Sequence, residues 1–173
     1  MKNIIVSGIS GKMGTKVYES AKDAGLNVVC GIDKDCYGNF DCPVYPSFKD
    51  VKDYADVVID FSSPTNLGGL LGYCLENKTP LVIATTGFSK NDEKTISEAA
   101  KTIPVLKIAN TSLTVNYFIK TVAEMAKALA SYDVEIIERH HNHKKDAPSG
   151  TAKMLVKAIK QVRKIESISY GRH

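Results

Sequence analysis

The sequence has no tryptophan, no long apolar run and no marked excess of charge of either sign. Its 23 basic and 19 acidic residues are scattered along 173 positions and give a net charge of +4. A nucleic-acid-binding protein needs a basic stripe, so we expect no nucleic-acid partner. No stretch approaches the roughly 18 apolar residues of a membrane span, and the start "MKNIIVSG" is too short for a signal-peptide core. These absences predict a cytoplasmic globular protein without a membrane partner.

The sequence is also poor in cysteine, with only Cys30, Cys36, Cys42 and Cys74. They form no C-x-x-C pair, and a chain with this much aliphatic sequence does not need disulfides to fold. We predict four reduced thiols that pack as small apolar side chains. The even gaps between the first three match no common zinc spacing, which argues against a metal site among them.

What the sequence does contain is a series of short apolar runs rich in β-branched residues and separated by helical patterns. The runs lie at 3–7, 28–32, 56–61, 80–84 and 104–108, and the helical patterns lie at 13–24, 65–77 and 91–101. Continuous rather than alternating apolar character is typical of strands that are covered on both faces. The alternation of such strands with helices predicts an α/β fold with a doubly wound, parallel, Rossmann-type sheet.

The pattern changes after Ile108. Residues 110–112 can cap a long helix whose apolar face continues to residue 129, and a second helix follows Ser149. Alternation over 133–139 and the run at 165–170 predict two strands. We therefore place a first domain at residues 1–112 and part of a second, α+β domain at 113–173.

The motif "GISGKMG" lies between the first strand and its helix. In this context, backbone N–H groups and the helix N-terminus bind a pyrophosphate. The spacing is G-x-x-G-x-x-G, which differs from the usual dinucleotide fingerprint. Gly8 permits the tight turn, Gly11 allows a phosphate to approach the backbone, and Gly14 lets the helix pack on the strand. A tight turn in a protein that binds no nucleotide is the alternative.

An acidic residue, Asp33, ends the second predicted strand at the position expected for binding an adenosine ribose. Lys34 beside it and Lys12 in the glycine turn would favour a 2′-phosphate instead, so these residues fit either NADH or NADPH. The segments "ATTGFS" and "IANTS" end the fourth and fifth strands at the same edge of the sheet, where doubly wound proteins bind ligands.

The stretch "ERHHNHKKDAPSGTA" gathers three histidines and two lysines before a helix. Ser149 can cap that helix and leave the N–H groups of Gly150 and Thr151 free for a carboxylate. Lys144 and a histidine would add charge-assisted hydrogen bonds and exchange a proton, which predicts a site for a small dicarboxylate. The alternatives are a solvated basic loop and a metal site, although two adjacent lysines would repel a divalent cation.

Taken together, these motifs resemble those of the dihydrodipicolinate reductase (4-hydroxy-tetrahydrodipicolinate reductase) family. The resemblance rests on "GISGKMG", "DVVIDFSSP", "ATTGF", "ANTSLTVN" and "ERHHNHKKDAPSGTA", in the family's order and spacing. It implies reduction of dihydrodipicolinate to tetrahydrodipicolinate by NADH or NADPH in the diaminopimelate and lysine pathway. The chain departs from the family at Lys12, where arginine is common, and at Ala84 and Thr114, where glycine is usual.

By position, the resemblance implies a role for each part of the site. The pyrophosphate would lie on Gly8, Ile9, Ser10, Gly11, Lys12 and Met13, and the adenosine ribose on Asp33 and Lys34. The nicotinamide would be flanked by Ala84, Thr85, Thr86, Ile108, Ala109, Asn110 and Thr111. His140 would donate or accept a proton, Lys144 would donate one, and the substrate would be bound by His141, Lys144, Gly150 and Thr151.

Members of the family continue well beyond the end of this chain, with further strands of the substrate domain and the sheet through which subunits form a homotetramer. We therefore expect an incomplete substrate domain with an apolar patch, and favour a fragment over a chain whose patch is covered by partner subunits. Two other functions stay open. One is a dinucleotide-binding module without turnover; the other is a metal-dependent protein built on the histidine cluster, which predicts bound zinc, and we expect none.

Overall fold

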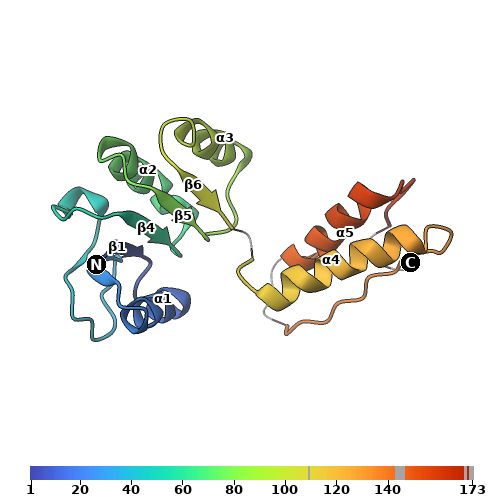
Figure 1. The fold of residues 1–173 in the computed structure, drawn as a ribbon, viewed down its shortest axis with the longest axis horizontal. Coiled ribbons are helices and arrows are strands. Elements are labelled where there is room, and N and C mark those ends of the chain that lie inside the picture. The colour runs from blue at the N-terminus through green and yellow to red at the C-terminus, as the bar shows by residue number, and fades with distance from the viewer. Residues whose placement is uncertain (109, 143–146, 170, 172–173) are drawn as a thin grey trace. The chain divides into compact units, whose positions relative to one another are not determined.

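The computed structural model describes residues 1–108, 110–142, 147–169 and 171. The chain divides into two compact units, residues 1–109 and 110–173, each with its own packing (Figure 1). None of the helices in the described ranges is both long and apolar enough to cross a membrane.

The first unit is built on one parallel sheet in the order β3-β2-β1-β4-β5-β6. Its strands are β1 (Asn3–Ser7), β2 (Asn27–Ile32), β3 (Val44–Tyr45), β4 (Val57–Asp60), β5 (Leu81–Ile83) and β6 (Val105–Lys107). The five strands predicted from apolar runs are confirmed, with small differences at their ends. The sixth, β3, was not predicted because its two residues form no apolar run of their own and are defined only by pairing with β2.

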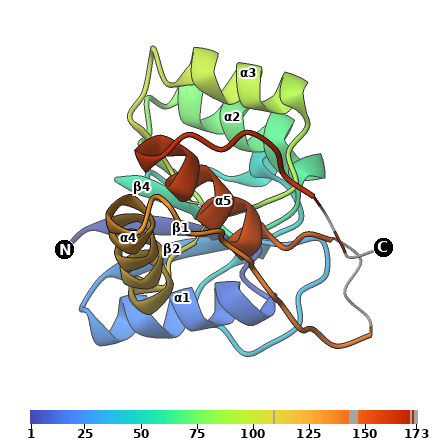
Figure 2. The ribbon, with the colours of Figure 1, turned by 90° about the vertical axis from the view of Figure 1, so that its right-hand side faces the viewer.

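Helices cover both faces of this sheet. Helix α1 (Lys12–Asp23) lies on one face, and α2 (Leu67–Glu76) and α3 (Lys90–Ala99) lie on the other (Figure 2). Two short 3-10 turns, Phe48–Asp50 and Pro64–Asn66, lie in the connections. Ser89 and Asp92 form a capping box that fixes the start of α3. The doubly wound α/β fold is therefore confirmed.

Consecutive residues of β1 show why the strands read as continuous apolar runs. Ile5 belongs to the larger cluster, which packs beneath α2 and α3, while Ile4 and Val6 belong to the cluster beneath α1. All three side chains are at most 1% exposed. Burial on both faces removes the polar alternation that marks a half-exposed strand.

The second unit consists mainly of α4 (Leu113–Ala128) and α5 (Gly150–Val162), which pack against each other. Ser112 and Ser149 cap the two helices, as predicted, by accepting hydrogen bonds from the backbone N–H groups of Val115 and Ala152. The buried apolar residues between them are Ala126, Ala152, Leu155 and Ile159. Other apolar side chains of this unit are largely exposed, among them Leu113, Tyr117 and Ile137.

The two strands predicted for the second unit are wrong for the described residues. Segments 133–139 and 165–169 form no strand, and residue 170 lies outside the described ranges. A strand requires a neighbouring strand to accept and donate its backbone hydrogen bonds, and the described part of this unit provides none. The alternating pattern is therefore present without the ladder that would make it a sheet.

Two helical glycines give a matched test of the packing in the first unit. A Cβ atom on Gly14 would lie 1.8 Å from the carbonyl oxygen of Gly8, whereas a Cβ atom on Gly72 would have no neighbour within 4 Å. We expect Gly14→Ala to lower the free energy of unfolding by about 2–3 kcal/mol through overpacking. Gly72→Ala should raise it by about 0.5–1 kcal/mol through helix propensity.

Urea unfolding followed by circular dichroism measures both variants under the same conditions. Equal midpoints for Gly14→Ala and Gly72→Ala would contradict the proposed close approach of α1 to the first turn.

Candidate functional site

The glycine turn between β1 and α1 lies at the carboxyl edge of the sheet, in contact with the ends of two neighbouring strands. Gly8 has φ +78°, and a Cβ atom on it would lie 2.6 Å from the carbonyl oxygen of Phe61, which follows β4. Its N–H donates to the carbonyl oxygen of Ile32 at the end of β2, at 2.7 Å. Both the conformation and the space therefore require glycine at this position.

The N-terminus of α1, which is the positive end of the helix dipole, lies at this turn. Gly11 is the N-cap and carries no side chain to accept the first N–H groups, and no acceptor is described for those of Lys12 and Met13. Such free N–H groups at a helix N-terminus favour an anion. Ile9 is different, because its side chain is fully buried and packs on Gly31. Only its backbone can face a ligand.

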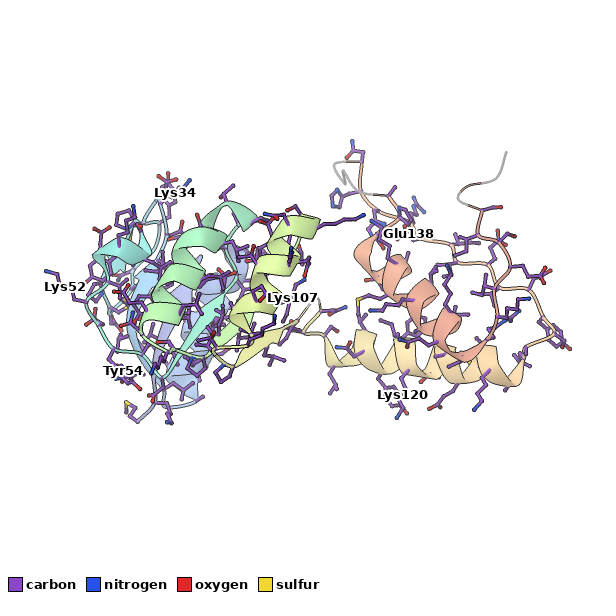
Figure 3. All side chains as sticks on the ribbon, turned by 90° about the horizontal axis from the view of Figure 1, so that it is seen from above. Lys34, Lys52, Tyr54, Lys107, Lys120 and Glu138 are labelled. Carbon is purple, nitrogen blue, oxygen red and sulfur yellow. The ribbon has the colours of Figure 1, made fainter. Side chains whose placement is uncertain are left out.

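Asp33 lies directly against the turn. Its Oδ2 accepts a hydrogen bond from the N–H of Ser10 at 3.0 Å, and its own N–H donates to the carbonyl oxygen of Tyr45 at 3.0 Å. The side chain of Ser10 in turn accepts from the N–H of Tyr37 at 3.2 Å. Lys34 is exposed at the periphery of the first unit (Figure 3). The structure thus brings Asp33 and the glycine turn together across 23 sequence positions.

The end of β4 contributes a buried carboxylate that the sequence interpretation missed. Asp60 is 1% exposed, and its Oδ1 accepts from the hydroxyl of Ser62 at 2.6 Å and from the N–H of Ser62 at 3.3 Å. Asp60 is the register partner of Ser7 at the end of β1. These bonds fix the loop that approaches Gly8. An acidic residue at the end of an otherwise apolar run was the available signal.

The ends of β5 and β6 lie along the same edge. The N–H of Ala84 donates to the carbonyl oxygen of Asp60 at 2.9 Å, and that of Ile108 donates to Ile83 at 2.8 Å. The hydroxyl of Thr85 is buried and has no partner among the described residues, whereas Thr86 is exposed.

The other three residues predicted to contact the nicotinamide do not belong to the described part of the first unit. Ala109 lies outside the described residues. Asn110 and Thr111 belong to the second unit, where the Oδ1 of Asn110 accepts from the N–H of Ser112 at 2.8 Å.

In the second unit, the histidine segment meets the start of α5 through Glu138 (Figure 3). The Oε1 of Glu138 accepts from the N–H of Ser149 at 2.8 Å, and its Oε2 lies 3.8 Å from the Nδ1 of His140. His140 is about 40% exposed and His141 is also exposed. Glu138 was not predicted, although an acid at the start of a strongly basic stretch is visible in the sequence.

Gly150 and Thr151 are the first residues of α5, and their N–H groups have no acceptor among the described residues. N–H groups without an acceptor at a helix N-terminus favour an anion, and these lie beside the contact of Glu138 with Ser149. Lys144, which completes the predicted site, lies outside the described ranges, as does His143. No group of three possible metal ligands is found among the residues that the structure describes.

The contact between Asp60 and Ser62 can be measured by a double-mutant cycle with Asp60→Ala, Ser62→Ala and the double variant. We expect a coupling of about 1–2 kcal/mol, because the hydroxyl donates to a buried carboxylate. Urea unfolding of the four proteins gives the value. Strictly additive effects would show that the bond does not fix the loop.

Comparison with known proteins agrees with this architecture. Residues 2–111 match the family model described as "Dihydrodipicolinate reductase, N-terminus", and residues 114–172 match "Dihydrodipicolinate reductase, C-terminus". The protein named 4-hydroxy-tetrahydrodipicolinate reductase from Caldanaerobacter subterraneus subsp. tengcongensis is 48% identical over 100% of this chain and 69% of that protein. The protein of the same name from Clostridium tetani is 42% identical over 99% of this chain and 69% of its own.

A solved structure gives the same result. The dipicolinate-bound dihydrodipicolinate reductase from Paenisporosarcina sp. TG-14 superposes with a TM-score of 0.78 at 26% identity, over 99% of this chain and 69% of that one. The two family models together cover both units, and the relatives and the solved structure each match across both. The chain therefore belongs to the dihydrodipicolinate reductase family.

Proposed function

We propose that this chain is an NAD(P)H-dependent reductase that converts dihydrodipicolinate, or its hydrate 4-hydroxy-tetrahydrodipicolinate after loss of water, to tetrahydrodipicolinate. The reaction belongs to diaminopimelate and lysine biosynthesis, and we place it in the cytoplasm. The observation that carries the proposal is the carboxyl edge of the first unit, where the free N–H groups at the start of α1 and Asp33 meet at one glycine turn. The identity with reductases across both units supports the substrate.

In this proposal the first unit holds the dinucleotide. The pyrophosphate lies on the backbone of residues 8–13, the adenosine ribose is bound by Asp33 with Lys34 beside it, and the nicotinamide is flanked by residues 84–86 and 108–111. The bound cofactor supplies the hydride. The residues of the turn orient the cofactor, and their backbone N–H groups compensate the charge of its phosphates.

The second unit binds the substrate and provides the proton. The N–H groups of Gly150 and Thr151, together with His141, bind a substrate carboxylate at the positive end of α5. Addition of hydride to the conjugated ring leaves negative charge that one proton neutralises, and Lys144 donates that proton. His140 is the second group that exchanges a proton, and Glu138 orients it relative to the start of α5.

The second candidate function, a dinucleotide-binding module without turnover, is favoured by one observation. The first unit has a complete six-stranded sheet, whereas the described residues of the second unit contain two helices and no strand. Absorbance at the reduced-nicotinamide band separates the two functions. The substrate is freshly made by the preceding synthase and added to the chain with NADH or NADPH. Loss of absorbance that depends on the substrate establishes the reductase. Constant absorbance, with the reduced cofactor still bound to the chain, favours the dinucleotide-binding module without turnover.

The role of Lys144 gives a specific prediction. We expect Lys144→Ala to lower kcat by about 10²–10⁴-fold with little change in the KM of the cofactor, because a general acid acts on the chemical step. Lys157→Ala is the matched control, since Lys157 is an exposed lysine within α5 and should leave turnover unchanged. Full turnover of the Lys144→Ala variant would remove its proposed role.

A further inference from the structure

We infer that Asp60, to which the proposed function assigns no role, is a positioning residue for the nicotinamide end of the cofactor. Its buried carboxylate holds the loop after β4, residues 61–64, and this loop lies between the glycine turn and the segment that follows β5. The inference rests on the proposed function, in which the turn binds the pyrophosphate and residues 84–86 flank the nicotinamide. Three observations carry it: where the carboxylate lies, what it binds, and which segments the loop meets.

The carboxylate of Asp60 lies inside the first unit, on the face of the sheet that α2 covers. Val58, two residues earlier on β4, belongs to the cluster beneath α2 and α3, and side chains two apart on a strand share a face. The charge of Asp60 also acts on α2, because burial and, after it, this negative charge raise the pKa of the Cys74 thiol to about 12. Asp60 is 1% exposed, so its carboxylate acts on a ligand only through the residues around it.

The described hydrogen bonds of this carboxylate all come from one residue of the loop. Its Oδ1 accepts from the hydroxyl of Ser62 at 2.6 Å and from the N–H of Ser62 at 3.3 Å. A buried carboxylate is costly unless donors compensate its charge, and hydrogen bonds to a charged acceptor are about twice as strong as those between neutral groups. The end of β4 therefore holds Ser62 more firmly than an ordinary turn would.

The loop lies between the two segments that the proposed function assigns to the cofactor. On one side it packs on the glycine turn, where a Cβ atom on Gly8 would lie 2.6 Å from the carbonyl oxygen of Phe61 and 2.9 Å from the Cα of Ser62. On the other side, the ring of Pro64 would lie 3.9 Å from a Cβ atom on Gly87. Gly87 directly follows the segment proposed to flank the nicotinamide. A shift of the loop would therefore change the separation of the two segments.

Asp60 also binds the second segment through its backbone. Its carbonyl oxygen accepts from the N–H of Ala84 at 2.9 Å, and Asp60 is the register partner of Ile83 on β5. One residue thus binds the loop with its side chain and the nicotinamide segment with its main chain. A ligand that spans both segments needs them at a fixed separation, because its second contact adds affinity only where the geometry lets both form at once. A ligand that occupies the glycine turn alone has no such requirement.

Two ligands titrated by calorimetry against the full chain separate positioning from stability. In the proposed function NADH occupies both segments, whereas ADP-ribose lacks the nicotinamide ring. Ser62→Ala removes the hydroxyl donor to Asp60 and retains the N–H donor. We expect this variant to raise the Kd of NADH about five- to tenfold and that of ADP-ribose less than about twofold, because the lost bond went to a charged acceptor and affects the far segment.

Two further variants complete the comparison. Ser97→Ala is the matched control, because it removes an exposed hydroxyl of α3 that donates to the carbonyl oxygen of Glu93, and it should change neither Kd. Ser62→Thr restores a hydroxyl and should return the Kd of NADH to within about twofold of the wild-type value. Equal weakening of both ligands by Ser62→Ala, or unchanged binding of NADH, overturns the inference and leaves the proposed function standing. Failure of the wild-type chain to bind either ligand would overturn the proposed function itself.

The fluorescence lifetime of bound NADH gives a readout that does not depend on affinity. It is measured at saturation for the wild-type chain and for Asp60→Asn, which keeps an oxygen for Ser62 but removes the charge. We expect the lifetime to fall toward that of free NADH in the variant, because the nicotinamide ring is held less firmly. An unchanged lifetime in a folded, saturated Asp60→Asn protein would contradict a positioning role for Asp60.

Discussion

The close approach of Gly14 to the carbonyl oxygen of Gly8 is the constraint on which the proposed cofactor site depends. No residue with a Cβ atom fits at Gly14, because that atom would lie 1.8 Å from the oxygen. The approach lets α1 begin immediately after the turn, so that its free N–H groups lie at the carboxyl edge of the sheet. A wider turn would move the helix terminus away from β2 and β4. The sheet edge and the helix dipole would then no longer act on the same ligand.

Two acidic residues at this edge have different surroundings and different consequences. Asp60 is buried, and its carboxylate is used to fix the loop that lies against Gly8. Asp33 is half-buried at the rim, with one oxygen held by Ser10 and the other directed to no described partner. The first supports the shape of the turn, and the second leaves a charge that a ligand must accommodate. The same strand-end position thus fixes a loop in the case of Asp60 and, in the proposed function, binds the cofactor in the case of Asp33.

Much of the first unit could be predicted from the sequence because its signals are local. Apolar runs buried on both faces identified five strands, and glycine spacing identified the turn. What was missed depends on residues far apart in the chain. The strand β3 exists through pairing with β2, and the contacts of Glu138 and Ser149 could not be read from spacing. The strands expected at 133–139 and 165–170 are not found among the described residues, because the pattern of one strand says nothing of the partner strand with which it would pair. The roles of His140 and Lys144 stay predictions.

The central claim is that the glycine turn of the first unit binds the dinucleotide. Amide chemical shifts of the ¹⁵N-labelled chain, recorded during titration with NADH in the absence of substrate, test it most directly. The account predicts that the largest changes fall on the amides of residues 8–13 and on Asp33, with small changes in α3. Changes confined to the start of α5, or changes of similar size throughout the chain, would contradict it.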